Sequence, residues 1–184
     1  GFLSGASTHT AMPTYDGNTL IVAEERSNGN VKIYDISMID QPNDPQNPVL
    51  LATLNRTSVG IEAYSPHHIH LHGNLLFIPW YEAGLQVFNI SNPANPVHVG
   101  AFDTFAGTST NYNGNWGVDL SHGLNRVLLS DRKRGLIVVD ASGVVAYGRR
   151  TNNQAAVIII NRSNSTQTGA IPVAGYLPNG VTLN

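Results

Sequence analysis

Short apolar runs rich in β-branched residues alternate with turn residues along the chain. Each run holds three or four residues and is punctuated by Gly, Asn, Asp or Pro. The runs are 20–22, 31–34, 75–78, 85–88, 127–129, 136–139 and 157–160. Runs of this length and composition predict β-strands joined by tight turns. No window of helical length keeps a period of about 3.6 residues, so the predicted fold class is all-β.

Four of these strands belong to a repeat that ends in Asp or Asn, one further residue and Ser. The Asx positions are Asp35, Asn89, Asp140 and Asn161. Asp35 and Asn89 are 54 residues apart, and Asn89 and Asp140 are 51 apart. An Asx side chain can accept a hydrogen bond from the backbone two residues on, which closes the turn after the strand. A unit of about 40–50 residues with several short strands is the period of a β-propeller blade.

The repeat divides the chain into a run of blades within a single-domain fragment. Blade one covers 7–54, blade two 64–104, a partial blade three 114–142, and a partial blade or divergent tail 143–184. In blade two we expect strands over 66–71, 75–80, 85–89 and 97–102. About half a blade is missing near residue 142. Three to four blades leave a propeller incomplete, because closure usually takes about four to eight.

The second unit carries the motifs that point to a known family. They are Ser-Pro-His-His at 65–68, Gly-Asn at 73–74, and Trp-Tyr-Glu-Ala-Gly-Leu-Gln-Val-Phe-Asn-Ile-Ser at 80–91. This stretch resembles the LVIVD-repeat family, as do residues 116–140, and the weaker resemblance extends over about 7–142. The resemblance implies a secreted or cell-surface β-propeller of the choice-of-anchor kind. It implies no activity, because fold alone does not fix function.

Composition and charge exclude several classes. The chain of 184 residues has a formal net charge of −2, with no Cys and 12% charged residues. Such a charge balance, with no basic run, argues against a nucleic-acid partner. No apolar stretch reaches the roughly 18 residues that a transmembrane helix needs. The absence of Cys excludes a disulfide scaffold and a thiol enzyme, and the low charge suits an extracellular protein.

Alternating histidines are the first candidate for chemistry. His68, His70 and His72 would share one face of a strand, whereas His67 would lie on the opposite face. Imidazoles bind Zn²⁺ or Cu²⁺. Residues i and i+4 of a strand lie about 13 Å apart, so one ion cannot take all three. His68 and His70 with a ligand from another strand form a feasible metal site; the alternative is a polar strand face.

Two sets of residues recur at equivalent places in the units. His9, His67 and Trp116 stand where the blades begin, and would meet at one mouth of the channel if the first strands line it. Their alternative role is packing at the blade start. The turns between second and third strands carry Trp80, Glu82, Asp131 and Arg132. Carboxylates there could hold a cation such as Ca²⁺ or act as an acid/base pair, or form salt bridges between blades.

Asparagine glycosylation is a further expectation. Sequons begin at Asn55, Asn89, Asn161 and Asn164. Asn89 and Asn161 already belong to the repeat's own turn, so Asn55 and Asn164 are the stronger candidates. No Gly-x-Ser-x-Gly elbow, phosphate loop or His-Glu-x-x-His motif occurs.

These observations predict a secreted or cell-surface propeller module with a structural or protein-interaction role. Its missing blades would come from another segment or chain, or from a second copy. One alternative is a metal-dependent enzyme that uses His67, His68 or His70 with Glu82 or Asp131. Another is a glycan-binding module built on Trp80, Tyr81, Tyr112 and Trp116. We expect no cofactor apart from a divalent metal, Zn²⁺, Cu²⁺ or Ca²⁺, in the metal-binding alternative.

Overall fold

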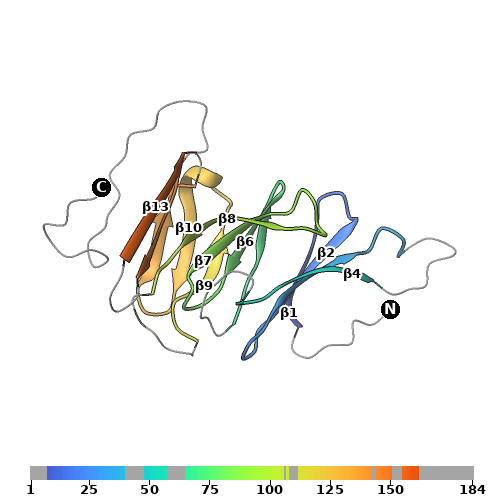
Figure 1. Ribbon diagram of the computed structural model, residues 1–184, viewed down its shortest axis with the longest axis horizontal. Coiled ribbons are helices and arrows are strands. Elements are labelled where there is room, and N and C mark those ends of the chain that lie inside the picture. Colours follow the sequence, from blue (N-terminus) through green and yellow to red (C-terminus); the bar gives the residue numbers. More distant parts are fainter. Residues whose placement is uncertain are drawn as a thin grey trace, which may run out of the picture.

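Three antiparallel sheets follow one another along the chain, and a separate hairpin ends the described region (Figure 1). The structure, a computed structural model, describes residues 8–39, 48–57, 65–105, 107, 112–141, 144–150 and 155–161. Within these residues the only helix is the 3-10 turn η1, Leu124–Arg126. The all-β prediction is therefore confirmed. In the described part of the chain, no helix is long and apolar enough to span a bilayer.

The first two sheets have four strands each, in chain order. The first holds β1 (Thr8–Pro13), β2 (Thr19–Glu24), β3 (Val31–Asp35) and β4 (Val49–Leu54). The second holds β5 (His70–His72), β6 (Leu75–Pro79), β7 (Leu85–Asn89) and β8 (Val97–Phe102). The third sheet has β9 (Asn115–Asp119), β10 (Val127–Asp131) and β11 (Gly135–Val139). A four-stranded meander of short strands is the form of a propeller blade.

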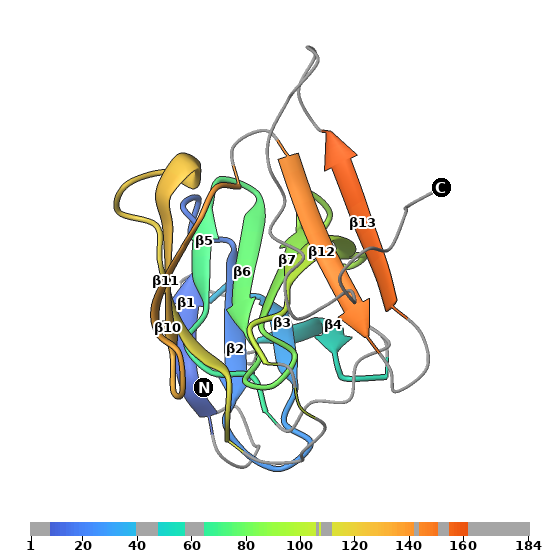
Figure 2. The same cartoon turned by 90° about the vertical axis from the view of Figure 1, so that its left-hand side faces the viewer.

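The hairpin of β12 (Val144–Arg150) and β13 (Ala155–Asn161) stands apart from the third sheet. Figure 2 shows it to one side of the other strands, and β12 contacts β8 of the second sheet. Among the described strands, β11 therefore pairs on one side only, with β10. The sheets of the described residues do not close into a ring.

Asx side chains close the turns after β3 and β7, as the repeat predicts, whereas Ser142 and Ser163 of the two later predicted turns lie outside the described residues. The amide of Ser37 donates to Asp35 Oδ1 at 2.8 Å, and that of Ser91 donates to Asn89 Oδ1 at 2.9 Å. The third sheet repeats the arrangement after its first strand, where the Ser121 amide donates to Asp119 at 3.0 Å.

The predicted strand over 66–71 is wrong at its start. Strand pairing begins only at His70, and residues 65–69 are irregular. Pro66 has no amide hydrogen to give to a ladder, and the His67 amide reaches the Pro79 carbonyl at 2.9 Å without continuing the register. Consequently His67 and His68 do not point to opposite faces of a strand.

The second sheet packs on both neighbours. Leu76 and Ile78 of β6 belong to the core shared with the first sheet, which also contains Ile21 and Ile33. Phe77, between them, faces the other way into the core shared with the third sheet. Since alternate residues of a strand point to opposite faces, a strand buried on both faces must be apolar throughout. This is why β6 is a continuous apolar run.

Candidate functional site

Two β-bulges aim side chains at the junction of the three sheets. Between β1 and β2 the register shifts between Thr8 and Thr10, which makes His9 the extra residue. Between β9 and β10 the shift falls between Ser130 and Asp131, and Trp116 is the extra residue on β9. A bulge redirects the side chain that it inserts. The equivalent positions of the first and third sheets are therefore turned toward the same place.

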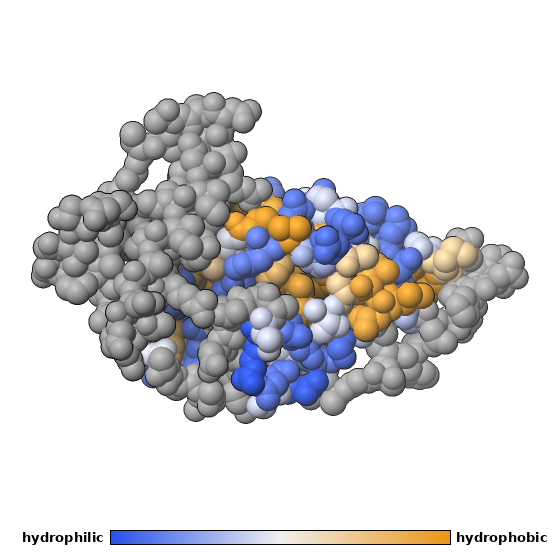
Figure 3. Space-filling model, in the orientation of Figure 1, coloured by the Kyte–Doolittle hydropathy of each residue, from blue (hydrophilic) through white to orange (hydrophobic). Residues whose placement is uncertain are grey.

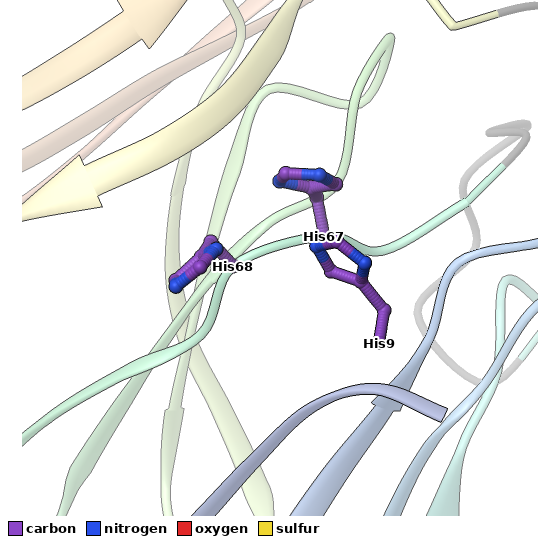
Figure 4. A group of neighbouring side chains, drawn as sticks. All are labelled: His9, His67 and His68. Atoms are coloured by element: carbon purple, nitrogen blue, oxygen red, sulfur yellow. The ribbon is translucent and has the colours of Figure 1, made fainter. Parts of the chain in front are cut away.

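The second sheet contributes His67 and His68 to this junction from the irregular segment before β5. The ring centroids of His67 and His9 are 4.2 Å apart, and those of His67 and Trp116 are 5.5 Å apart. His68 lies 5.9 Å from His9 and 5.7 Å from His67. Figure 4 shows the three histidine side chains as neighbours that come from two separate segments. The structure thus brings together His9, His67 and Trp116, which the sequence places at equivalent blade starts.

Hydrogen bonds of Tyr81 and Asn115 hold the junction of the three sheets in place. Tyr81 adopts a left-handed backbone with φ of 35°, which costs a non-Gly residue about 1–3 kcal/mol. Its carbonyl accepts hydrogen bonds from the amides of Gly84 and Asn115, both at 2.9 Å. The Asn115 side chain donates to the carbonyls of Gly117 and Ser130 at 2.9 and 3.0 Å, and so holds the bulge at Trp116.

Glu25 lies at the centre of the polar contacts. The Tyr81 hydroxyl donates to Glu25 Oε1 at 2.6 Å. His9 Nδ1 lies 3.2 Å from Oε2 of the same carboxylate, and His67 Nε2 lies 3.6 Å from Oε1. One carboxylate at the end of β2 is therefore shared by residues of the first and second sheets.

The electrostatic setting favours the neutral forms of His67 and Tyr81. Burial lowers the pKa of His67, with His9 and His68 acting in the same direction, against the opposing effects of the Trp116 carbonyl and Glu25. Burial, together with the hydrogen bond to Glu25, raises the pKa of Tyr81 well above its ordinary value. The Trp116 carbonyl can only accept, so His67 Nδ1, 2.5 Å away, carries the proton. Nε2 of neutral His67 then carries an unshared electron pair, 3.6 Å from Glu25 Oε1.

This arrangement can act chemically as a ligand or metal site. The nitrogens of His9, His67 and His68 that could hold a metal ion all lie within 4.8 Å of one another. Trp116, 45% exposed, adds an aromatic face beside them. The other aromatic candidates expose almost no ring surface to a ligand, because Trp80 is fully buried in the core and Tyr81 is 2% exposed. Tyr112 packs edge-on against Tyr81, with 5.1 Å between ring centroids.

The remaining predicted site residues lie outside the histidine group. His70 is on β5, 6.4 Å from His68 between ring centroids. Glu82 is buried and accepts from the Asn113 side chain at 3.3 Å. Asp131 accepts from the amides of Lys133 and Arg134 at 2.8 and 2.7 Å, which closes the turn to β11.

Arg132 donates to the Tyr112 carbonyl at 2.7 Å. It therefore ties the turn after β10 to the segment that precedes β9.

The sequon residues have differing surroundings. Asn55 is partly exposed just after β4. The Asn89 side-chain oxygen accepts from both the amide and the hydroxyl of Ser91. Asn161 ends β13, where only the backbone is described, and Asn164 lies outside the described residues. Glycosylation at these positions stays a prediction.

Sequence reasoning missed the contacts of Glu25, Tyr81 and Asn115. Glu25 lies in the first unit's counterpart of the turns that carry Glu82 and Asp131, but the repeat does not show that it contacts His9, His67 and Tyr81. Asn115 precedes the blade-start residue Trp116, and only the paired register shows that it supports a bulge. The segment Gly-Asn-Trp-Gly at 114–117 is the one local signal, since Gly inside a strand pattern is typical of a bulge or a close approach.

Comparison with known proteins identifies the second sheet. Residues 66–104 match the model of the LVIVD repeat. The chain carries an LVIVD repeat. This repeat contributes His67, His68 and Tyr81 to the junction, while His9, Glu25 and Trp116 come from the flanking sheets. No curated protein matches the chain.

A solved structure supports the propeller fold. The periplasmic gluconolactonase PpgL of Pseudomonas aeruginosa superposes with a TM-score of 0.52 and 14% sequence identity. The match covers 85% of this chain and 43% of that one. The chain therefore spans less than half the length of this structural neighbour. At this identity the likeness shows the fold alone, a propeller-like arrangement of sheets.

Proposed function

We propose that the chain is an extracellular β-propeller module that works by binding other protein, and that its third sheet is the surface on which a further blade packs. The observation that carries this proposal is the open strand β11, whose Leu136 and Val138 are 68% and 57% exposed. These residues are two apart and so lie on one face of the strand. Exposed apolar residues on an unpaired edge are otherwise an aggregation hazard.

The occupant that fits this face is another propeller blade. Within the described chain, each sheet that has a neighbour buries apolar residues of its central strands against it. Ile137 and Val139 already pack on the second sheet from one face of β11. Leu136 and Val138 present the opposite face, which in a propeller meets the next blade. Whether that blade belongs to another chain or to a longer form of this one, the chemistry of the contact is the same.

An extracellular or cell-surface location agrees with the same features. The low charge, the LVIVD repeat and the periplasmic location of the structural neighbour all favour it. Fractionation of the source cells, with an antibody that detects this chain, would test the location directly.

Sedimentation of the full chain tests the blade-packing face. Because no other blade is present in this experiment, we expect the chain to cover the exposed face by associating with itself. We expect the double variant Leu136→Ser, Val138→Ser to shift it toward monomer. The matched control is Val49→Ser, Leu50→Ser on β4, where the residues are 58% and 51% exposed. Figure 3 shows an apolar patch over this part of the first sheet. The control should leave association unchanged.

Two results would overturn the proposal. One is a monodisperse, cooperatively melting monomer of the unaltered chain. The other is an equal loss of association in both double variants, which would mean that surface hydrophobicity in general drives it.

A further inference from the structure

Three histidine side chains from two distant parts of the sequence lie next to one another. His9 is aimed there by the bulge in β1, while His67 and His68 arrive on the irregular segment before β5. Their nitrogens lie within 4.8 Å of one another (Figure 4). His67 is buried, whereas His9 and His68 are exposed and can turn about their side-chain bonds. One fixed ring and two adjustable rings thus share a small volume.

The polar contacts of His67 and His9 are of the kind that metal-binding histidines make. A ligating imidazole usually gives its second N–H to a backbone carbonyl or a carboxylate, which fixes the ring and its tautomer. His67 gives Nδ1–H to the Trp116 carbonyl at 2.5 Å, which leaves Nε2, 3.6 Å from Glu25 Oε1, as the nitrogen that can coordinate. His9 Nδ1 faces Glu25 Oε2 at 3.2 Å. Glu25 is in turn held by the Tyr81 hydroxyl at 2.6 Å.

We propose that His9, His67 and His68 bind one divalent transition-metal ion of the Zn²⁺ or Cu²⁺ class, with Glu25 as the positioning residue for His9. Imidazole nitrogens suit these ions, while Ca²⁺ and Mg²⁺ prefer oxygen ligands. Three protein ligands leave a fourth tetrahedral position for water or a small ligand. Trp116 lies beside the group, 5.5 Å from the His67 ring, and gives that position an aromatic neighbour.

The distances require a small closure on binding. Zn–N bonds of about 2.0–2.1 Å put two tetrahedral ligands about 3.3 Å apart. The observed spread of up to 4.8 Å must therefore shrink by about 1.5 Å at its widest. Rotation of the exposed His9 and His68 side chains toward His67 supplies such a movement, since rotamers of exposed side chains exchange rapidly.

Titration calorimetry with ZnCl₂ and with CuCl₂ tests the site, on the full chain after chelator treatment. We expect one ion per chain, with CaCl₂ giving no comparable heat. His9→Ala and His68→Ala should each weaken binding by about tenfold or more, and Glu25→Gln by about tenfold. Both histidines are exposed, so circular dichroism should show unchanged folding.

The matched control is His72→Ala, which removes an exposed histidine of β5 from outside the group. It should bind as the unaltered chain does. Trp116→Ala should also bind, because the His67 partner there is the backbone carbonyl. Absence of stoichiometric Zn²⁺ or Cu²⁺ binding would overturn the proposal, as would equal weakening by His72→Ala and His9→Ala.

This test is separate from that of the blade-packing face. His9 lies on β1, and His67 and His68 lie on the segment before β5, whereas Leu136 and Val138 are on β11 of the third sheet. If the chain binds metal but stays monomeric, only the proposed function is overturned. If the chain associates but does not bind metal, only the proposed metal site is overturned.

Discussion

Two carboxyl groups, the buried Glu24 and the half-buried Asp103, respond in opposite ways to their surroundings. Burial alone favours the neutral form of Glu24, but hydrogen bonds from Lys32 at 2.6 Å and Arg26 at 2.9 Å outweigh it and lower the pKa. The groups around Asp103 offset the effect of its burial less completely. Burial raises its pKa to about 6, against the lowering effect of the Phe105 amide at 2.7 Å.

The free energy of unfolding should depend on pH through the ionisation of Asp103. Its pKa is raised in the folded state above the ordinary value of 3.8, so the folded chain binds the extra proton. Stability therefore falls as pH rises from about 4 to about 6, and the loss is complete above that range. Asp103→Asn removes the ionisation and should gain about 1–3 kcal/mol over the unaltered chain at neutral pH.

Urea unfolding of both proteins at about pH 5 and about pH 7.5 measures this difference. The gain should be larger at the higher pH. An equal stability difference at both values would show that the carboxyl titrates in its ordinary range.

At the scale of the strands and turns, bulges and close backbone approaches decide where side chains go. Gly114, with φ of 81°, lets the segment before β9 approach the turn at Tyr81. A Cβ on Gly114 would lie 2.4 Å from the Tyr81 carbonyl oxygen. That carbonyl joins the second sheet to the third through the Asn115 amide. The site is therefore built by element geometry as much as by its own residues.

Gly114→Ala should lower the free energy of unfolding by more than the left-handed backbone at this position alone explains. Gly135 is the matched control, because its φ is 76° but its Cβ would meet nothing within 4 Å. Gly135→Ala should lose about 1 kcal/mol of unfolding free energy for the left-handed backbone. Gly114→Ala should lose a further 1–3 kcal/mol or so for the clash, measured by urea unfolding. Equal losses would mean that the turn at Tyr81 yields freely.

At the scale of the molecule, the sheets are held together by side chains that alternate between two cores. Phe77 and Ile78 are neighbours on β6 and are both almost fully buried. Phe77 packs toward Val118, Val127 and Leu129 of the third sheet. Ile78 packs toward the core of the first sheet. One strand thus couples three sheets through its two faces.

Truncation of these neighbours should loosen different parts of the molecule. Phe77→Ala should cost about 3–5 kcal/mol and Ile78→Ala about 2–5 kcal/mol. Hydrogen exchange should then show protection lost first in β9 and β10 for Phe77→Ala, and in β2 and β3 for Ile78→Ala. The same exchange pattern in both variants would mean that the three sheets open as one unit.

The strands and turns could be predicted from the sequence because their signals are local. Apolar runs bounded by turn residues gave the strands β2, β3, β6, β7, β10 and β11, and the Asx-x-Ser spacing gave the turns at Asp35 and Asn89. The equivalence of His9, His67 and Trp116 also followed from the repeat. Each of these depends on residues close together in the chain, where backbone sterics and side-chain hydrogen bonds act.

What joins His9 to His67 is decided only by tertiary structure. The two residues are 58 positions apart, and their 4.2 Å ring contact requires a bulge in β1, a strand that starts late at His70, and two sheets packed face to face. Pattern alone placed His68 with His70 and His72 on one face, because alternation assumes a regular strand. The irregular backbone at 65–69 and the shared core determined instead which imidazoles meet, since packing between sheets sets distances that periodicity cannot.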